Sequence, residues 1–261
     1  MLVQSNRVSG ASPLDLLARA RDLVPEIAAA ARETERSRCV PESIVAKLKD
    51  AELLRVCQPA RTGGFEYGGE VLLDLALSLA PACAATAWCG LVAIGHSWLL
   101  SLFDVAAQDD VWAHDPNAIL CGSYAPTGKA EATGGGYNLS GSWSFASGCD
   151  HARWAIVGAI VPAKGDAKPY PAFFLIPASD YIIEDDWFTS GLAGTGSKTI
   201  ASSGCFVPHH RIIDFAAAMG GNAPGAAAHS NPCYRLPLVS YIPVTLGVVA
   251  VGAAQGAVRD Y

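Results

Sequence analysis

Positions 75–103 are the feature that most constrains the fold of this chain, because they contain no Asp, Glu, Lys or Arg. An uncharged run of this length has to be buried, either in the core of a protein or in a membrane. Pro81 and His96 interrupt the run, and no Lys or Arg lies close enough on either side to anchor a membrane helix. The segment therefore predicts buried helices of a protein core.

A second uncharged run covers positions 236–258, with Arg235 and Arg259 at its two ends. Its length and its flanking charges make a membrane span the alternative interpretation. Its many glycine and alanine residues and its polar interruptions are typical of helices that pack closely in a core. We therefore predict no membrane segment.

Charge and cysteine content exclude other classes of protein. The formal net charge is −6 and no block of Lys or Arg is present, so we expect no nucleic-acid partner. The eight cysteines are scattered, without a C-x-x-C pair or a compact His/Cys cluster, so we expect reduced thiols and no metal site. Residues 1–7 lack the apolar core of an export signal, which favours a cytoplasmic protein.

The first part of the chain has the pattern of helices. Ser12 followed by Pro13 is a helix start, with a capping side chain and a proline at the first helical position. Pro41 opens a second helical pattern, and helical spacing of apolar residues continues over positions 71–111. We predict an N-terminal helical domain over residues 1–118.

From Ile119 the pattern changes to that of antiparallel β-structure, in a chain of the α+β class. Pro208 cannot continue a central strand and should end the last predicted one. We predict a middle β domain over residues 119–232 and the start of a second helical domain over 233–261, with a helix from about Val244. The predicted strands include positions 137–140, 154–161, 173–176 and 205–207.

The specific signal of this chain is spread over several segments: Trp143–Trp154, Trp88 with His96, Ser123–Pro126, Gly191–Ser197 and Phe206–Arg211. Together they resemble, in the same order, the two-component aromatic hydroxylases known as acyl-CoA-dehydrogenase-like, or group D, flavin monooxygenases. Within that family the likeness is greatest to the hydroxylases of bacterial steroid-ring degradation. The resemblance runs from about Leu14 to the end of the chain.

The resemblance implies an acyl-CoA dehydrogenase-like fold and a defined chemistry. Such an oxygenase component receives reduced flavin, FADH2 or FMNH2, from a separate flavin reductase. It then uses O2, through a C4a-hydroperoxyflavin, to hydroxylate a small phenolic or polycyclic aromatic substrate. The full-length proteins of this family are expected to form homotetramers. This chemistry requires a pocket that excludes water.

Two residues are predicted to be catalytic through the resemblance. Ser147 matches a serine that lies near flavin N5, where a neutral hydroxyl can form a hydrogen bond without adding charge. His96 matches a histidine near the substrate hydroxyl, where a neutral imidazole could accept the phenolic proton or hold it by a hydrogen bond. Without the resemblance, Ser147 would be interpreted as a turn residue and His96 as a satisfied core histidine.

The remaining predicted site residues are cofactor-binding positions. Trp88 and His96 lie eight residues apart and therefore on roughly one face of a helix. Glycine- and serine-rich loops often serve only as turns, and a tryptophan on a strand is most often plain core, so structural roles remain the alternative. The predicted flavin contacts are Trp88, Ser123, Tyr124, Trp143, Ser147, Gly148, Thr195 and Ser197.

Two other patterns were weighed for different chemistry. The segment Gly191–Thr199 is one residue out of step with a phosphate-binding P-loop, because a serine separates its last glycine from Lys198. The adjacent residues of Cys149–His151 and of His209–His210 do not converge easily on one metal ion. We therefore expect neither nucleotide triphosphate binding nor a metal site.

Members of the family continue well past the position of Tyr261 into a helical bundle that carries a further active-site histidine. The predicted site residues thus form half of a site, and this chain is expected to be inactive alone if the bundle is missing. One alternative on the same fold is an acyl-CoA dehydrogenase, or a relative that oxygenates nitrogen or sulfur. An alternative of another class is a non-catalytic, flavin-free protein for binding or assembly.

Overall fold

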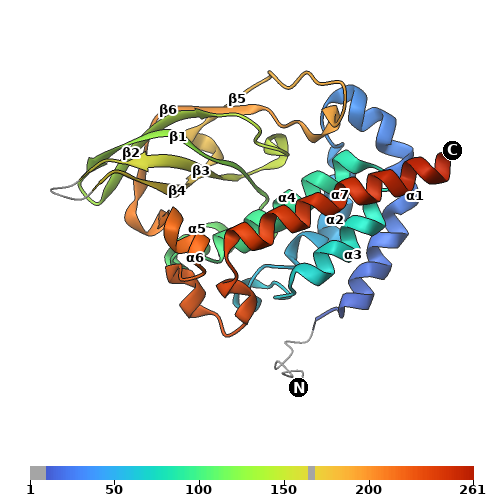
Figure 1. Cartoon of the computed structure of the whole chain (residues 1–261), viewed down its shortest axis with the longest axis horizontal. Helices are drawn as coiled ribbons and strands as arrows, with labels where there is room; N and C mark the ends of the chain where they lie inside the picture. The colour runs from blue at the N-terminus through green and yellow to red at the C-terminus, as the bar shows by residue number, and fades with distance from the viewer. Residues whose placement is uncertain (1–9, 164–167) are drawn as a thin grey trace.

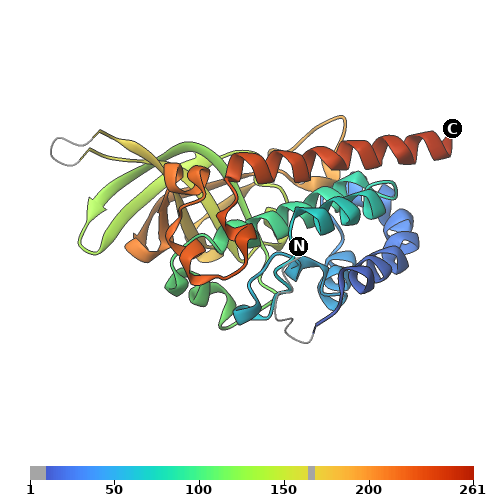
Figure 2. The ribbon, with the colours of Figure 1, turned by 60° about the horizontal axis from the view of Figure 1, so that its bottom comes forward.

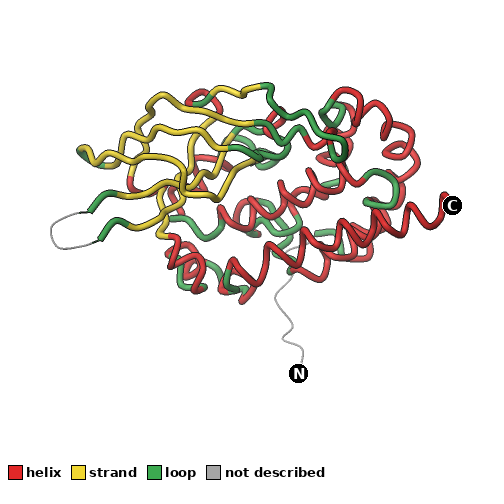
Figure 3. The backbone as a smooth tube through the Cα atoms, turned by 45° about the horizontal axis from the view of Figure 1, so that its top comes forward, coloured by secondary structure: helices red, strands yellow, loops and turns green. Residues whose placement is uncertain are grey.

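The computed structural model describes residues 10–163 and 168–261. Residues 1–7, interpreted above as lacking an export signal, lie outside the described part. Figure 1 shows helices gathered at one end of the molecule and a sheet at the other, and Figure 3 separates the two by colour. The order along the chain is helical, then β, then helical, as predicted from the sequence.

The N-terminal helix α1, Pro13–Ser37, begins where its sequence predicts. The Ser12 hydroxyl accepts a hydrogen bond from the Asp15 amide, and the Asp15 carboxylate accepts one from the Ser12 amide, which completes a capping box. Helix α2, Glu42–Asp50, follows directly after Pro41. Both helices bury their apolar faces, including Leu16 and Ile44.

The long uncharged run forms buried helices in the protein core. It is divided between α3 (Gly69–Leu79) and α4 (Ala84–Leu100), with Pro81 in the break between them, and α5 (Val105–Trp112) follows. Helix α4 contacts α3, α7 and β1 and is therefore the central helix of the molecule. Burial on nearly all sides explains why it has no charged residue.

Seven strands form one sheet, in the order β5-β6-β2-β1-β3-β4-β7. Five of its six strand pairings are antiparallel, as predicted, whereas β1 and β3 run parallel. The parallel pair arises because the chain crosses over after β2 and returns to the start of β1. The strands are β1 (Leu120–Thr133), β2 (Gly136–Trp143), β3 (Trp154–Val161), β4 (Tyr170–Pro177), β5 (Ile182–Glu184), β6 (Thr199–Pro208) and β7 (Ile212–Asp214).

Short helical turns connect these elements, and several of them hold residues of the site described below. The helix α6 covers Phe215–Gly220. The single 3-10 turns are η1 (Leu53–Arg55), η2 (Ala60–Thr62), η3 (Cys149–His151), η4 (Ala178–Asp180), η5 (Ala193–Thr195), η6 (His209–Arg211), η7 (Pro224–Ala228) and η8 (Pro232–Arg235). The predicted domain limits fall between α5 and β1 and inside η8.

The last helix, α7, covers Leu238–Asp260 and so begins before the predicted position 244. It lies along the outside of the helical end (Figure 2) and contacts α3 and α4. Gly252 and Gly256 face Ala80 and Pro81 so closely that a Cβ atom would clash, which agrees with the close packing predicted for this run. Within the described residues, Leu238–Arg259 is the one helix long and apolar enough to cross a membrane, and 29% of its most apolar window is buried.

Candidate active site

A cavity of about 210 Å³ opens where α4, the first residues of β1, the loop after β2 and α7 meet. Its surface is mainly apolar, with a few polar groups among aromatic and aliphatic side chains, which is the usual character of a small-molecule site. Its volume is too small to enclose a whole dinucleotide. It is lined by Trp88, Leu91, Val92, Gly95, His96, Gly122, Ser123, Tyr124, Phe145, Ser147 and Leu246.

His96 contributes a neutral hydrogen-bond acceptor to this cavity. Its Nδ1 lies 2.8 Å from the Val92 carbonyl oxygen, which can only accept, so Nδ1 carries the hydrogen and Nε2 a lone pair. Burial lowers the pKa of His96 to about 4. Nε2 is buried and has no hydrogen-bond partner in the protein. An unpartnered polar atom of this kind is costly unless a ligand satisfies it.

The start of β1 is shaped around that imidazole. A Cβ atom at Gly122 would lie 2.0 Å from the Ile156 carbonyl oxygen and 2.7 Å from Nε2 of His96, so both the neighbouring strand and the imidazole require glycine here. The Tyr124 ring lies 5.3 Å from the His96 ring, centroid to centroid, and also contacts Phe173 edge to face. The pairing of β1 with β3 shifts register after Ser123, as bulged strands often do beside active sites.

A chain of hydroxyl groups leads from the cavity into the protein. The Trp88 indole N–H donates to Ser147 Oγ at 3.0 Å, and Ser147 Oγ lies 2.7 Å from Ser197 Oγ. Ser197 Oγ lies 2.6 Å from Thr195 Oγ1, which donates to the Leu192 carbonyl oxygen at 2.9 Å. The three hydroxyl residues are buried. Four predicted flavin-site residues therefore form one connected hydrogen-bond system.

Helix α1 holds the loop that supplies Thr195 and Ser197. The Glu35 carboxylate accepts hydrogen bonds from the amides of Ala193 and Gly194, each at 3.1 Å, at the start of η5. On the other side, the Gly148 amide donates to the Thr195 carbonyl oxygen at 2.9 Å. Gly148 has φ of +71°, which glycine adopts without strain, and this turn brings its amide to the loop.

Phe145 is a site residue that the sequence did not reveal. Its ring lines the cavity although its side chain is 69% exposed, and it packs edge to face against Trp187 at 5.7 Å between centroids. Its φ of +65° is unfavourable for a non-glycine residue, and such backbone strain is concentrated at functional sites. In the sequence it lies within the Trp143–Trp154 segment, two residues before Ser147, but it was not among the predicted site residues.

Trp143 does not line this cavity, contrary to its predicted place beside the others. It is fully buried, and its indole N–H donates to the Gly158 carbonyl oxygen at 2.7 Å. The absence of side chains at Gly128 and Gly141 leaves the space that its six-membered ring fills. Trp143 therefore stabilises the packing of the sheet. Gly148, Thr195 and Ser197 also stay outside the lining. Gly148 acts through its backbone, and the other two contact the cavity only through Ser147.

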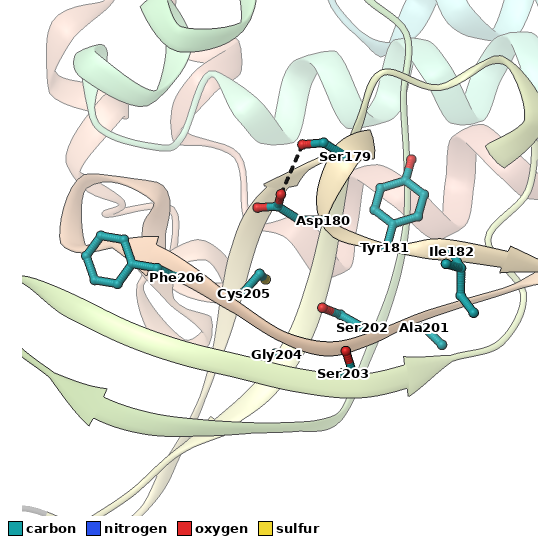
Figure 4. A pocket seen from close by; sticks show the side chains of 10 residues that line it. All are labelled: Ser179, Asp180, Tyr181, Ile182, Ala201, Ser202, Ser203, Gly204, Cys205 and Phe206. Atoms are coloured by element: carbon teal, nitrogen blue, oxygen red, sulfur yellow. Dashed lines mark hydrogen bonds between the residues drawn. The ribbon is translucent and has the colours of Figure 1, made fainter.

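A second and wider hollow of about 650 Å³ lies where η4 and β5 meet β6 (Figure 4). Two of its polar groups already bind each other, since the Ser179 hydroxyl donates to the Asp180 carboxylate at 3.0 Å. Among the described side chains, the buried polar atoms without a partner all lie elsewhere. The cavity at His96 is therefore the better candidate site.

The two patterns weighed for other chemistry have structural roles. Lys198 is followed by strand β6 rather than by the helix that a P-loop needs, and its ammonium group pairs with Asp150 at 2.8 Å. The ring nitrogens of His151 face the Glu42 carboxylate at 2.9 Å and the Val40 carbonyl at 2.8 Å. Within residues 10–163 and 168–261, no three His, Cys, Asp or Glu side chains are grouped to hold a metal ion.

Known proteins resemble this chain over most of its length. It is 43% identical over 249 residues to the oxygenase component of the FADH2-dependent resorcinol hydroxylase of Rhizobium sp. (strain MTP-10005), covering 94% of this chain and 60% of that protein. It is 39% identical over 243 residues to the flavin-dependent monooxygenase oxygenase subunit HsaA of Mycobacterium tuberculosis, covering 93% and 61%. No family model matches the sequence.

Solved structures agree with the sequence relatives. The HsaA monooxygenase from M. tuberculosis superposes with a TM-score of 0.91 at 38% identity, covering 95% of this chain and 68% of that one. XiaF from Streptomyces sp., solved in complex with FADH2 and glycerol, gives 0.83 at 31% identity, covering 94% and 62%. The chain spans about 60% of the length of the curated relatives that it matches.

The helical end and the mixed sheet, with the cavity between them, have the acyl-CoA dehydrogenase fold of the solved oxygenases that superpose on this chain. Three of the predicted site residues, Trp88, His96 and Ser147, line that cavity together. This chain belongs to the acyl-CoA-dehydrogenase-like family of flavin-dependent monooxygenases.

Proposed function

We propose that this chain is the oxygenase component of a two-component flavin monooxygenase that hydroxylates a phenolic or polycyclic aromatic compound. The observation that carries the proposal is that one largely apolar cavity holds the lone pair of His96 Nε2 and the hydroxyl of Ser147. Names of relatives support it, since they include hydroxylases of resorcinol and p-hydroxyphenylacetate.

The residues of the cavity fit the edge of a flavin ring. Ser147 offers a hydroxyl held between two partners, and Trp88 and Phe145 offer flat apolar surfaces beside it. These three residues, with Ser123 and Tyr124, would hold the ring. Reduced flavin, when bound, supplies the activation of O2 and the transfer of one oxygen atom to the substrate.

His96 orients the substrate in this proposal. Its neutral Nε2 accepts a hydrogen bond from the phenolic hydroxyl, which also satisfies an otherwise unpartnered buried atom. With a pKa of about 4, the imidazole is too weak a base to remove the proton of a phenol at neutral pH. Of the two roles predicted for His96, holding the hydroxyl by a hydrogen bond is therefore the one that its surroundings favour.

The apolar lining serves the same reaction by excluding water. Leu91, Val92 and Leu246 close the cavity on sides where no polar group is needed. A dry site would limit side reactions with water at a bound flavin, and it strengthens the hydrogen bonds of His96 and Ser147. The two functions of the cavity, orientation and exclusion of water, thus depend on different side chains.

The finer features of the reaction belong to the same proposal. FADH2 is the proposed flavin, because both a curated relative and a solved relative carry it in their names. A separate reductase supplies it, and the full-length protein is proposed to form a homotetramer. The eight free cysteines agree with a reducing compartment, which we propose to be the cytoplasm.

The test supplies the purified full-length protein with FADH2 from a flavin reductase, O2, and resorcinol or p-hydroxyphenylacetate as probes. We expect a product one oxygen atom heavier by mass spectrometry, formed only with enzyme, and its loss in Ser147→Ala. No hydroxylated product, together with no binding of FADH2 under anaerobic conditions, would reject the proposal. Bleaching of bound oxidised flavin by an acyl-CoA would indicate a dehydrogenase instead.

A further inference from the structure

Three hydroxyls behind the cavity, those of Ser147, Ser197 and Thr195, are hydrogen-bonded in series. The groups at the two ends of this series determine which hydroxyl donates to which. At the inner end, the Leu192 carbonyl oxygen can only accept, so the hydrogen of Thr195 Oγ1 points toward it over 2.9 Å. At the outer end, the Trp88 indole can only donate, and its N–H points to Ser147 Oγ over 3.0 Å. The two serines lie between these ends.

Each hydroxyl has one hydrogen, which settles the bonds between the ends. Because Thr195 has given its hydrogen to Leu192, Ser197 donates to Thr195 over 2.6 Å. Because the hydroxyl hydrogen of Ser197 already points to Thr195, Ser147 donates its hydrogen to Ser197 Oγ over 2.7 Å. The Ser147 hydrogen therefore points away from the cavity, and one lone pair of its Oγ remains for a ligand.

The surroundings hold the chain in this direction. Leu192 keeps a left-handed backbone, with φ of +55°, and its carbonyl oxygen also accepts from the Trp187 indole and the Thr195 amide, each at 3.1 Å. Reversing the chain would break the bond from Thr195 to Leu192 and turn the Ser147 hydrogen into an apolar cavity. The loss of one hydrogen bond and the exposure of an unpaired donor both oppose that reversal.

We propose that Ser197 and Thr195 make Ser147 a hydrogen-bond acceptor toward the cavity, and that this selects reduced over oxidised flavin. The inference rests on the proposed function, in which Ser147 faces the edge of the flavin ring, and on the family resemblance, which implies that this edge is the one with N5. N5 of a reduced flavin bears a hydrogen, which the Ser147 lone pair accepts. N5 of an oxidised flavin bears a lone pair, which faces the lone pair of Ser147. Ser197 and Thr195 are positioning residues in this arrangement, because they act through Ser147.

Anaerobic titrations with reduced and with oxidised FAD test this selection in the wild-type chain and two variants. Ser197→Ala frees the Ser147 hydrogen to turn into the cavity, and Thr195→Val removes the acceptor that holds Ser197. In both variants we expect the ratio of the two Kd values, oxidised over reduced, to fall about three- to tenfold, the range for one hydrogen bond. The change should include tighter binding of oxidised FAD, which mere damage to the pocket would not produce.

Ser97→Ala is the matched control. Ser97 is a buried serine of α4 whose hydroxyl donates to the Ala93 carbonyl oxygen, and it takes no part in the series of hydrogen-bonded hydroxyls behind the cavity. Its Kd ratio should equal that of the wild type. Equal weakening of both redox states in Ser197→Ala and Thr195→Val, with an unchanged ratio, overturns this inference and leaves the proposed function standing. Failure of the wild type to bind either form overturns both.

Discussion

The imidazole of His96 has lost its contact with water and retains one hydrogen bond, from Nδ1 to the Val92 carbonyl oxygen. Burial therefore favours its neutral form and lowers its pKa from 6.5 to about 4. The unfolded chain takes up a proton below pH 6.5 while the folded chain does not. Folding stability consequently falls as the pH decreases from about 6.5 to about 4, and this loss ends below the folded pKa.

The prediction is that His96 contributes about 3 kcal/mol to the loss of unfolding free energy between pH 7 and pH 4. His96→Gln should lack this part of the pH dependence, since glutamine does not titrate. Urea denaturation at pH 7, 5.5 and 4 measures it, and comparing the two proteins cancels the other buried histidine, His229. Parallel pH profiles for wild type and variant would contradict the burial of a neutral His96.

Individual side chains were predictable from the sequence only where a helix sets their spacing. Trp88 and His96 lie eight residues apart on α4, so a regular helix brings both to one face, and both line the cavity. Trp143 and Phe145 differ from this case, because the first is at the end of a strand and the second in a strained turn. The direction of side chains at such positions cannot be predicted from a periodic pattern. The ring of Trp143 lies where two glycines leave room for it.

Secondary-structure elements were predicted best where local chemistry defines their ends. The capping box at Ser12 and the two prolines, Pro41 and Pro208, coincide with element boundaries in the structure. The direction of β3 beside β1 was not predictable, because alternation has a period of two in parallel and antiparallel strands alike. That direction depends on the crossover that carries Ser147, which is a tertiary feature.

A helix far from the cavity holds the loop behind Ser147, because Glu35 of α1 accepts hydrogen bonds from the amides of both Ala193 and Gly194. Glu35→Gln replaces one of these two acceptor oxygens with a donor. We predict a loss of about 1 kcal/mol in unfolding free energy. We also predict faster hydrogen exchange of the Gly148 amide, which is bonded to the same loop through the Thr195 carbonyl.

The matched control on the same helix is Glu33→Gln, two residues before Glu35 and therefore on roughly the opposite face of α1. Glu33 pairs only with Arg36 on the exposed face of the helix, and exposed pairs of this kind contribute little. Its unfolding free energy and its Gly148 exchange rate should both stay near those of the wild type. If the two variants behave alike, the loop is held by contacts other than Glu35.

At the scale of the whole molecule, the cavity exists because separate layers meet. Helix α4 supplies Trp88 and His96, β1 supplies Ser123 and Tyr124, and α7 adds Leu246. The docking of α7 onto α3 and α4 therefore forms part of the wall of the site. Composition predicted burial of the uncharged runs, but it could not predict which glycines of α7 would be the points of contact.

The glycines of α7 make this docking testable. A Cβ atom at Gly256 would lie 2.5 Å from the Pro81 carbonyl oxygen, whereas one at Gly247 would meet nothing within 4 Å. Gly256→Ala should therefore push α7 away from the helical end and cost about 1–3 kcal/mol of unfolding free energy. Gly247→Ala should stabilise the protein by up to about 1 kcal/mol, because alanine favours a helix and fits there. Chemical denaturation measures the unfolding free energies of the two variants. Because Leu246 of α7 lines the cavity, Gly256→Ala should also weaken binding of FADH2. Equal stability of the two variants would mean that α7 does not pack against Pro81 in solution.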